Sequence, residues 1–250
     1  MKINGIETTS IVKISGTPIA SITKMAGVTL PASSPSSLAI FNADAATWEP
    51  GAPTTWEDLN GHIGELRNGT SYDAGNGGNM VFDGIDNYVY FPDETALNSQ
   101  TITMESWAYL NSTLSQNAFL FEKGNVNTQY SNFFYSDGNF YFRTMGPSNQ
   151  DLSIPSSTYM TADAWYHIVC TFEPGIKTIY VNGTQVNQLT GITGTISSDA
   201  TGLFLGAYYN YGSIDFLLNG RIAISRTYNI SLTSTQVLEN FNTEKARFGY

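Results

Sequence analysis

The stretch that decides the fold is Trp165-Tyr166-His167-Ile168-Val169-Cys170-Thr171-Phe172, followed by Tyr180-Val181-Asn182-Gly183. In an extended chain, alternate residues of the first part point to opposite faces, and here both faces carry large side chains. Such a strand belongs inside a two-layer structure. Asn-Gly between alternating runs is typical of a tight hairpin, because both turn residues need positive φ. The sequence therefore predicts a strand over 165–172 and a hairpin that joins 177–181 to 184–189.

Similar signals continue along the chain. Asp137-Gly138 is predicted to join 132–135 to 139–143 in the same way. Charged residues make up only 13% of the 250 residues, which suits short strands and turns better than helix bundles. Strands every ten or so residues, broken by turns, indicate a sandwich or jelly roll. The predicted fold class is all-β, in one domain large enough to bury a substantial core.

One short helix is predicted near the C-terminus. Thr233 and Gln236 have the spacing of a capping box, and Leu232 and Val237 fit the hydrophobic staple that accompanies it. We expect this helix over about 234–241.

The first thirty residues contain a repeat. A Lys-Ile/Met-x-Gly motif recurs every eleven residues, at Lys2, Lys13 and Lys24. Each unit is predicted to be a short strand plus a glycine turn, and three such units cannot bury a core. We therefore expect residues 1–30 to be an extended docking arm, 31–37 a linker rich in Pro and Ser, and 38–250 the main domain. A flexible leader with accidental similarity is the alternative.

Charge and hydropathy exclude several functions. The net charge of −10 argues against nucleic acid as partner. No run of apolar residues is long enough to span a membrane, and the start of the chain has no apolar signal-peptide core. The single cysteine, Cys170, excludes an internal disulfide framework and is predicted to pack in the core.

The order of the motifs carries more information than any one motif. It runs Trp56-Glu57-Asp58-Leu59-Asn60-Gly61, Val81-Phe82-Asp83-Gly84-Ile85-Asp86-Asn87-Tyr88-Val89, Thr103-Met104-Glu105-Ser106-Trp107, Phe121-Glu122-Lys123-Gly124, Trp165-Tyr166-His167, Tyr180-Val181-Asn182-Gly183, Leu205-Gly206 and Asn219-Gly220-Arg221-Ile222. Over about residues 38–245 this order resembles the concanavalin A-like lectin/glucanase (laminin-G-like) family. Residues 232–249 are most similar to the version found in bacteriophage virion structural proteins. The resemblance implies a concanavalin-like jelly-roll β-sandwich that serves as a binding module.

The resemblance also implies a calcium site. Family members often bind calcium through loop carboxylates, and Asp83, Asp86 and Asn87 match the family's Phe-Asp-Gly-x-Asp-Asp-Tyr segment. Asn87 replaces the second Asp of that pair, and Ala223 stands where many relatives have an Asp; both departures weaken the case. The alternative is turn chemistry, because Asp and Asn cap turns. No other cofactor is expected.

Hydrolases of this fold carry their acids on one strand, as Glu-x-Asp-x-Glu, so that the carboxylates share a cleft. This chain has no such cluster. His62 falls in a Gly-rich turn, and His167 falls where the family usually has a structural histidine. We therefore expect no catalytic residues.

A glycan site requires exposed aromatic rings beside amides. The candidates are the loop residues Tyr208, Tyr209, Asn210 and Tyr211, and secondly Tyr130 with Asn132. Tyrosine is also common at protein interfaces, which is the alternative for both groups.

We thus expect a non-enzymatic virion surface protein of a phage, decorating the capsid or associated with the tail or fibre. Residues 1–30 would attach it to capsid or tail proteins, for example by strand addition. Two other classes stay open: an adhesin that recognises a glycan on the host surface, and a polysaccharide-degrading glycoside hydrolase. A second copy of the chain is a further partner left open.

Overall fold

The computed structural model describes residues 34–48, 54–92, 95–111, 117–125, 128, 130–148 and 151–250. Within the first thirty residues it also describes three antiparallel strand pairs: β1 (Lys2–Ile3) with β2 (Ile6–Glu7), β3 (Lys13–Ile14) with β4 (Thr17–Pro18), and β5 (Lys24–Met25) with β6 (Val28–Thr29). Each repeat of the predicted arm therefore contributes one strand pair. The rest of the arm lies outside the described residues.

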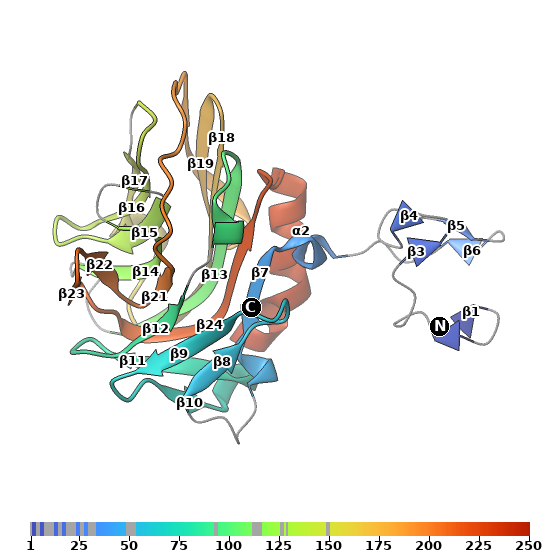
Figure 1. Ribbon diagram of the computed structural model, residues 1–250, viewed down its shortest axis with the longest axis horizontal. Coiled ribbons are helices and arrows are strands. Elements are labelled where there is room, and N and C mark those ends of the chain that lie inside the picture. Colours follow the sequence, from blue (N-terminus) through green and yellow to red (C-terminus); the bar gives the residue numbers. More distant parts are fainter. Residues whose placement is uncertain are drawn as a thin grey trace.

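The main domain is built from two antiparallel sheets, and each contains eight of the described strands (Figure 1). The back sheet has the order β10 (Ser71–Asp73), β11 (Asn79–Asp83), β24 (Asn219–Tyr228), β13 (Ile102–Leu110), β18 (Ala164–Glu173), β19 (Ile176–Val181) and β20 (Thr184–Thr190), and β7 (Phe41–Asp44) also pairs with β24. The front sheet has the order β17 (Asp151–Pro155), β16 (Asn139–Thr144), β15 (Tyr130–Phe134), β14 (Ala118–Lys123), β21 (Leu203–Leu205), β12 (Tyr88–Phe91), β9 (Ile63–Arg67) and β8 (Thr55–Glu57). A separate hairpin pairs β22 (Tyr208–Asn210) with β23 (Ser213–Asp215). The prediction of an all-β jelly-roll sandwich is confirmed.

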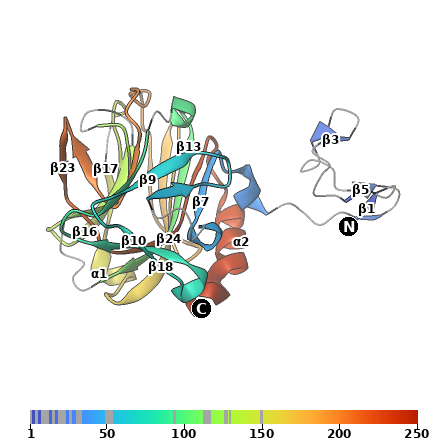
Figure 2. The same ribbon diagram turned by 60° about the horizontal axis from the view of Figure 1, so that its bottom comes forward.

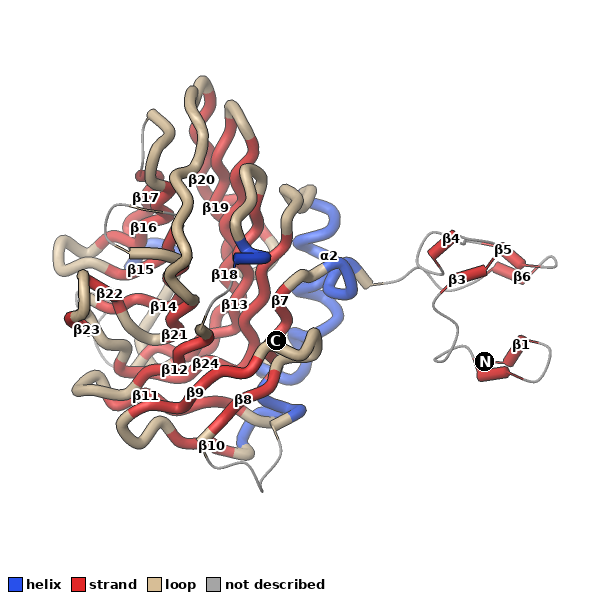
Figure 3. Tube along the Cα trace, viewed as in Figure 1, coloured by secondary structure: helices blue, strands red, loops and turns tan. Residues whose placement is uncertain are grey.

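The main core lies between the two sheets. Trp56, Phe82 and Phe121 are among its fully buried side chains. The helical segments are α1 (Ser156–Tyr159), α2 (Ser234–Glu244) and the 3-10 turns Pro35–Leu38, Ala45–Thr47, Gly75–Gly77, Thr95–Leu97 and Lys245–Phe248. Of the described helices, none is long and apolar enough to cross a membrane. Figures 2 and 3 show α2 against the outer face of the back sheet.

Helix α2 begins as the sequence predicts. The Thr233 side chain accepts from the Gln236 amide, and the Gln236 side chain accepts from the Thr233 amide, which completes the capping box. Leu232 and Val237 are both buried in one cluster, as the hydrophobic staple requires. The helix ends at Glu244, beyond the predicted end, and the Glu244 carboxylate accepts from Trp107 and Arg226 of the back sheet.

The strand and hairpin that decide the fold are confirmed as β18, β19 and β20. Ile168 and Cys170 face the main core, whereas Val169 faces the helix side. In the turn, Asn182 and Gly183 have φ values of 50° and 76°, as a tight primed turn requires.

The Asp137-Gly138 turn differs from its prediction. It does join β15 to β16, but of its two residues Gly138 alone has positive φ, at 86°. The Gly138 amide donates to the Tyr135 carbonyl. The connection is therefore longer than a two-residue primed turn, and this places Tyr135 at its start.

The end of the predicted linker is part of the folded domain. Pro35 is buried, and the Ser36 amide donates to Asn240 of α2 at 3.1 Å. The described part of the main domain thus begins at Ser34, and residues 31–33 lie outside the described residues.

Candidate functional site

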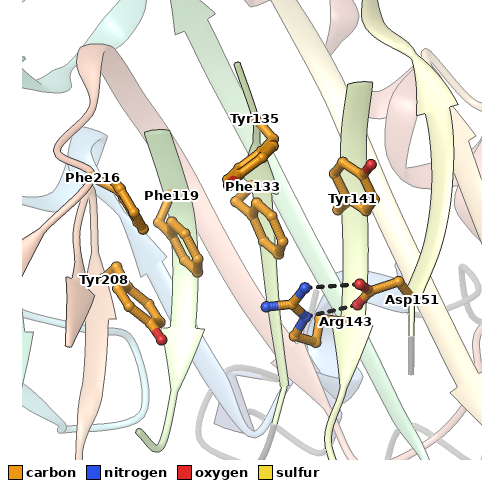
Figure 4. A pocket seen from close by; sticks show the side chains of 8 residues that line it. All are labelled: Phe119, Phe133, Tyr135, Tyr141, Arg143, Asp151, Tyr208 and Phe216. Carbon is orange, nitrogen blue, oxygen red and sulfur yellow. Dashed lines mark hydrogen bonds and ion pairs between the residues drawn. The ribbon is translucent and has the colours of Figure 1, made fainter. Parts of the chain in front are cut away.

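A second aromatic cluster lies on the outer face of the front sheet, away from the main core. Strand alternation places Phe119 of β14, Phe133 of β15 and Tyr141 of β16 on this face. These rings form the floor of a hollow of about 330 Å³. The residues that line it are Phe119, Phe133, Tyr135, Tyr141, Arg143, Asp151, Tyr208 and Phe216 (Figure 4). We call this the first hollow.

The floor is a ladder of nearly parallel rings. The ring centroids of Phe119 and Phe133 lie 4.4 Å apart at an interplanar angle of 6°, and those of Phe133 and Tyr141 lie 5.3 Å apart at 11°. Phe216 extends the ladder at the other end, 6.1 Å from Phe119. Rings stacked in this way cover one another's faces. The inner rings therefore support the hollow and offer little face to a ligand.

Two rings at the rim remain accessible. Tyr135 is 41% exposed and Phe216 is 38% exposed. The Tyr135 ring lies nearly perpendicular to the ladder, at 79° to Phe133 and 87° to Tyr141. These exposed rings are the ones that can stack on a ligand.

One end of the hollow is polar. Arg143 holds Asp151 through two parallel bonds, with Nε–Oδ1 and Nη2–Oδ2 distances of 2.7 Å each. The Arg143 guanidinium also lies 5.0 Å from the centre of the Phe133 ring. The Tyr141 hydroxyl donates to Asp137 at 2.6 Å. The Arg143–Asp151 pair thus holds hydrogen-bond donors and acceptors in fixed positions beside aromatic rings. Such a pair can form hydrogen bonds with the hydroxyl groups of a neutral ligand.

The β22–β23 hairpin forms the opposite wall. The Phe216 carbonyl accepts from the Phe119 amide at 3.0 Å, which fixes the hairpin to β14. Phe216 has a φ of 50°, a costly conformation for a bulky residue that is common at ligand sites. The Glu122 carboxyl accepts from the Tyr209 amide at 2.5 Å. Burial raises the pKa of Glu122 well above its usual range and outweighs that bond and the nearby Arg143.

Residues 208–211 do not form the predicted loop: Tyr208–Asn210 are strand β22, and Tyr211 begins the turn to β23. Their side chains divide between the two sides of this wall. Tyr208 lines the first hollow, with its ring 4.7 Å from that of Phe119. Tyr209 turns to the other side and stacks on Phe204 at 5.0 Å and 6°. Asn210 and Tyr211 are exposed at the hairpin tip, and Tyr211 is 68% exposed. The last two do not line the first hollow.

The second predicted pair does not lie at the surface. Tyr130 is buried and donates its hydroxyl to the Leu97 carbonyl at 3.0 Å. Asn132 is fully buried on the same side of β15. Strand parity explains this result: Tyr130, Asn132 and Phe134 face the core, and Ser131 and Phe133 face outward. We therefore remove Tyr130 and Asn132 from the candidate site.

The predicted calcium residues lie together at the end of β11: Asp83 is its last residue, and Asp86 and Asn87 are in the loop that follows. Asp83 Oδ1 accepts from the backbone amides of Ile85, Asp86 and Asn87. Burial acts to raise the pKa of Asp83, but these amides outweigh it and lower the pKa. The Asn87 side chain donates to the Asn68 carbonyl at 2.8 Å. These bonds serve the turn itself, and calcium binding stays a prediction.

A buried polar network lies between the back sheet and α2. His167 donates from Nε2 to Glu105 at 2.7 Å, and Asn240 donates to the same carboxylate at 3.0 Å. Tyr228 also donates to it. Burial alone would raise the pKa of Glu105, but Arg226, His167 and Tyr228 outweigh it and lower the pKa to about 2. His167 is thus a framework residue, as the sequence predicts.

Glu105, His167 and Glu244 are also a group with metal-ligand character, because their ligand atoms lie within 4.8 Å of one another. Arg226 donates to Glu244 at 2.6 Å and Trp107 Nε1 donates to it at 2.7 Å. A guanidinium between two carboxylates supplies the compensating positive charge. We therefore interpret the group as a structural ion-pair network.

Sequence reasoning missed most of the first hollow. Tyr135 flanks the Asp137-Gly138 turn, and alternation along β16 places Tyr141 and Arg143 on one face. These two signals could have indicated an aromatic and cationic surface beside the hairpin.

The fold defines the class of the protein, a two-sheet antiparallel jelly roll with a hollowed aromatic face. A family model described as the concanavalin A-like lectin/glucanases superfamily matches residues 83–238, and the chain belongs to this family. No curated protein matches the chain in sequence.

Solved structures share the fold at low identity. The binding domain of botulinum neurotoxin DC, in complex with rat synaptotagmin II, is 14% identical with a TM-score of 0.65, covering 84% of this chain and 52% of that one. Domain 4 of AbnA, a GH43 extracellular arabinanase from Geobacillus stearothermophilus, was solved with arabinotriose. It is 16% identical with a TM-score of 0.63, covering 80% of this chain and 97% of that one. The chain spans about half the length of the neurotoxin binding domains it matches.

Proposed function

We propose that this protein is a carbohydrate-binding module and that the first hollow is its glycan site. The observation that carries the proposal is the combination of exposed Tyr135 and Phe216 rings with the fixed Arg143–Asp151 fork in one hollow. Pyranose and furanose rings have apolar faces that stack on aromatic side chains and hydroxyls that require fixed hydrogen-bond partners. The similarity to the arabinotriose-bound domain supports this class of ligand.

Of the classes of protein that the sequence left open, this proposal favours the adhesin that binds a glycan. It ranks the adhesin above a virion protein with a purely structural role. The motifs near the C-terminus are the support for placement on a phage particle. In that setting the ligand would be a glycan on the surface of the host.

The test is a glycan array probed with the full chain and with Tyr135→Ala. Loss of one stacking ring should weaken binding about fivefold, equivalent to roughly 1 kcal/mol. Tyr159→Ala is the matched control, because Tyr159 is 37% exposed and does not line the hollow. If no sugar on the array is retained, or if both variants bind like the unmodified chain, the proposal is wrong.

Attachment to a phage particle through residues 1–30 is a second candidate function. Three strand pairs recur at the repeat interval with the same register, as in Ile3↔Ile6, Ile14↔Thr17 and Met25↔Val28. Short strand pairs can add to a strand of another protein through backbone hydrogen bonds. Deleting residues 1–30 should then abolish co-sedimentation with the particle. Unchanged co-sedimentation would contradict this function.

A further inference from the structure

A second hollow lies on the same outer face of the front sheet. It has a volume of about 560 Å³. Tyr90 of β12, Phe204 of β21 and Tyr209 of the hairpin form its aromatic floor. The ring centroids of Tyr90 and Phe204 lie 4.7 Å apart, and those of Phe204 and Tyr209 lie 5.0 Å apart. The floor is thus a second ladder of rings, built like the first.

The two hollows share one wall. Tyr208 and Tyr209 are consecutive in β22, and they line the first and the second hollow respectively. Glu122, beneath them on β14, is 3% exposed and accepts from the Tyr209 amide. This hydrogen bond fixes the backbone between the Tyr208 and Tyr209 rings. One contact therefore positions both sides of the shared wall.

The strand order gives the scale of the combined surface. Tyr90 is on β12 and Tyr141 is on β16, with β21, β14 and β15 between them. Adjacent strands lie about 4.8 Å apart, so these two residues are separated by about 19 Å across the sheet. This span exceeds one sugar ring and suits a short oligosaccharide.

The second hollow also has polar groups at its rim. Asp199 accepts from the Asn125 side chain at 2.8 Å and from the Thr201 amide at 2.8 Å. All three residues line the hollow, together with Arg67. Aromatic rings beside fixed amide and carboxylate groups are the same chemistry as in the first hollow.

We propose that the second hollow is a second sugar subsite, and that the ligand is an oligosaccharide chain that occupies both hollows across the Tyr208–Tyr209 wall. This inference rests on the proposed carbohydrate binding at the first hollow. The protein would then prefer oligosaccharides to monosaccharides, since a single sugar fills one hollow only.

The test uses the full chain on an array that carries each sugar type as a length series from monosaccharide to long oligosaccharide. Binding should strengthen with length until both hollows are filled. Tyr90→Ala should weaken binding of long oligosaccharides by about fivefold and leave that of monosaccharides unchanged. Tyr90→Phe is the matched control, because it keeps the ring. Tyr135→Ala should weaken the binding of both ligand sizes.

Ala200→Arg gives an independent variant, because Ala200 is exposed and lines the second hollow. It should obstruct this hollow without removing core packing, and long oligosaccharides should then bind only as well as short ones. Suppose that oligosaccharide length has no effect on binding, or that Tyr90→Ala and Ala200→Arg both bind long oligosaccharides as well as the unmodified chain does. The proposal of a second subsite is then wrong, while the site in the first hollow is unaffected. If no sugar of any length binds, the proposed function falls as well.

Discussion

The Glu105 carboxylate accepts a hydrogen bond from His167 Nε2 at 2.7 Å, and both side chains are fully buried. The two residues lie on neighbouring strands, β13 and β18, and Glu105 also bonds Asn240 of α2. One carboxylate therefore connects the back sheet to the helix that covers it.

We predict that Glu105→Gln lowers the free energy of unfolding by about 3 kcal/mol at neutral pH, because it removes the fully buried member of the two carboxylates, Glu105 and Glu244, that balance the charge of Arg226. The folded-state pKa of Glu105 is lowered from 4.5 to about 2. The carboxylate thus contributes stability above pH 4.5 that is lost as the pH falls toward 2. Urea unfolding should show that the difference in the free energy of unfolding between the variant and the unmodified chain disappears as the pH falls through that range. Glu65→Gln, at an exposed pair with Arg67, should change little; equal effects of both variants would contradict the prediction.

Gly183→Val should destabilise the domain through two effects. The residue has positive φ, which costs a β-branched side chain about 1–3 kcal/mol. A Cβ there would also lie 3.0 Å from Leu238 and 3.1 Å from Phe241 of α2. Gly138→Val is the matched control, because Gly138 has positive φ and no atom within 4 Å of its Cβ position. The urea midpoint should fall further for Gly183→Val, and equal midpoints would show that the α2 contact is absent.

The parts of the fold that depend on neighbours in sequence could be predicted. The capping box needs only Thr233 and Gln236, and the primed turn needs only Asn182 and Gly183. Their contacts span a few residues, so the residue types alone determine them. The same holds for the alternation in β18.

The candidate site could not be predicted in this way, because it depends on strand register and on which face meets the core. In β15 both faces carry large aromatic residues, Tyr130 on one and Phe133 on the other, so hydrophobicity does not show which face points inward. Pairing with β14 and β16 decides it. The position of Phe216 depends on a hairpin that returns to β14 from far along the chain, through its carbonyl bond with Phe119.

Deleting residues 1–30 should leave a domain that melts close to the temperature of the full chain, since the strands described in this segment pair with one another and with neither sheet of the sandwich. Deleting residues 1–38 should lower the melting temperature, because it also removes the buried Pro35 and the bond from Ser36 to Asn240. Calorimetry on both truncations checks this. A large fall in melting temperature on deletion of residues 1–30 alone would show that the arm is part of the sandwich.

We expect no glycoside hydrolysis. Retaining hydrolysis needs an ionised nucleophile about 5 Å from an acid, and the carboxylates that line the two hollows are already bonded. Asp151 is held by Arg143 at both oxygens, and Asp199 accepts from neighbouring amides. Glu122, whose pKa burial raises, accepts from the Tyr209 amide. Incubation of the full chain with β-glucan, arabinan and galactan should release no reducing ends. Glu122→Gln sharpens the test, because turnover that this substitution abolishes would make Glu122 a catalytic acid and the protein an enzyme.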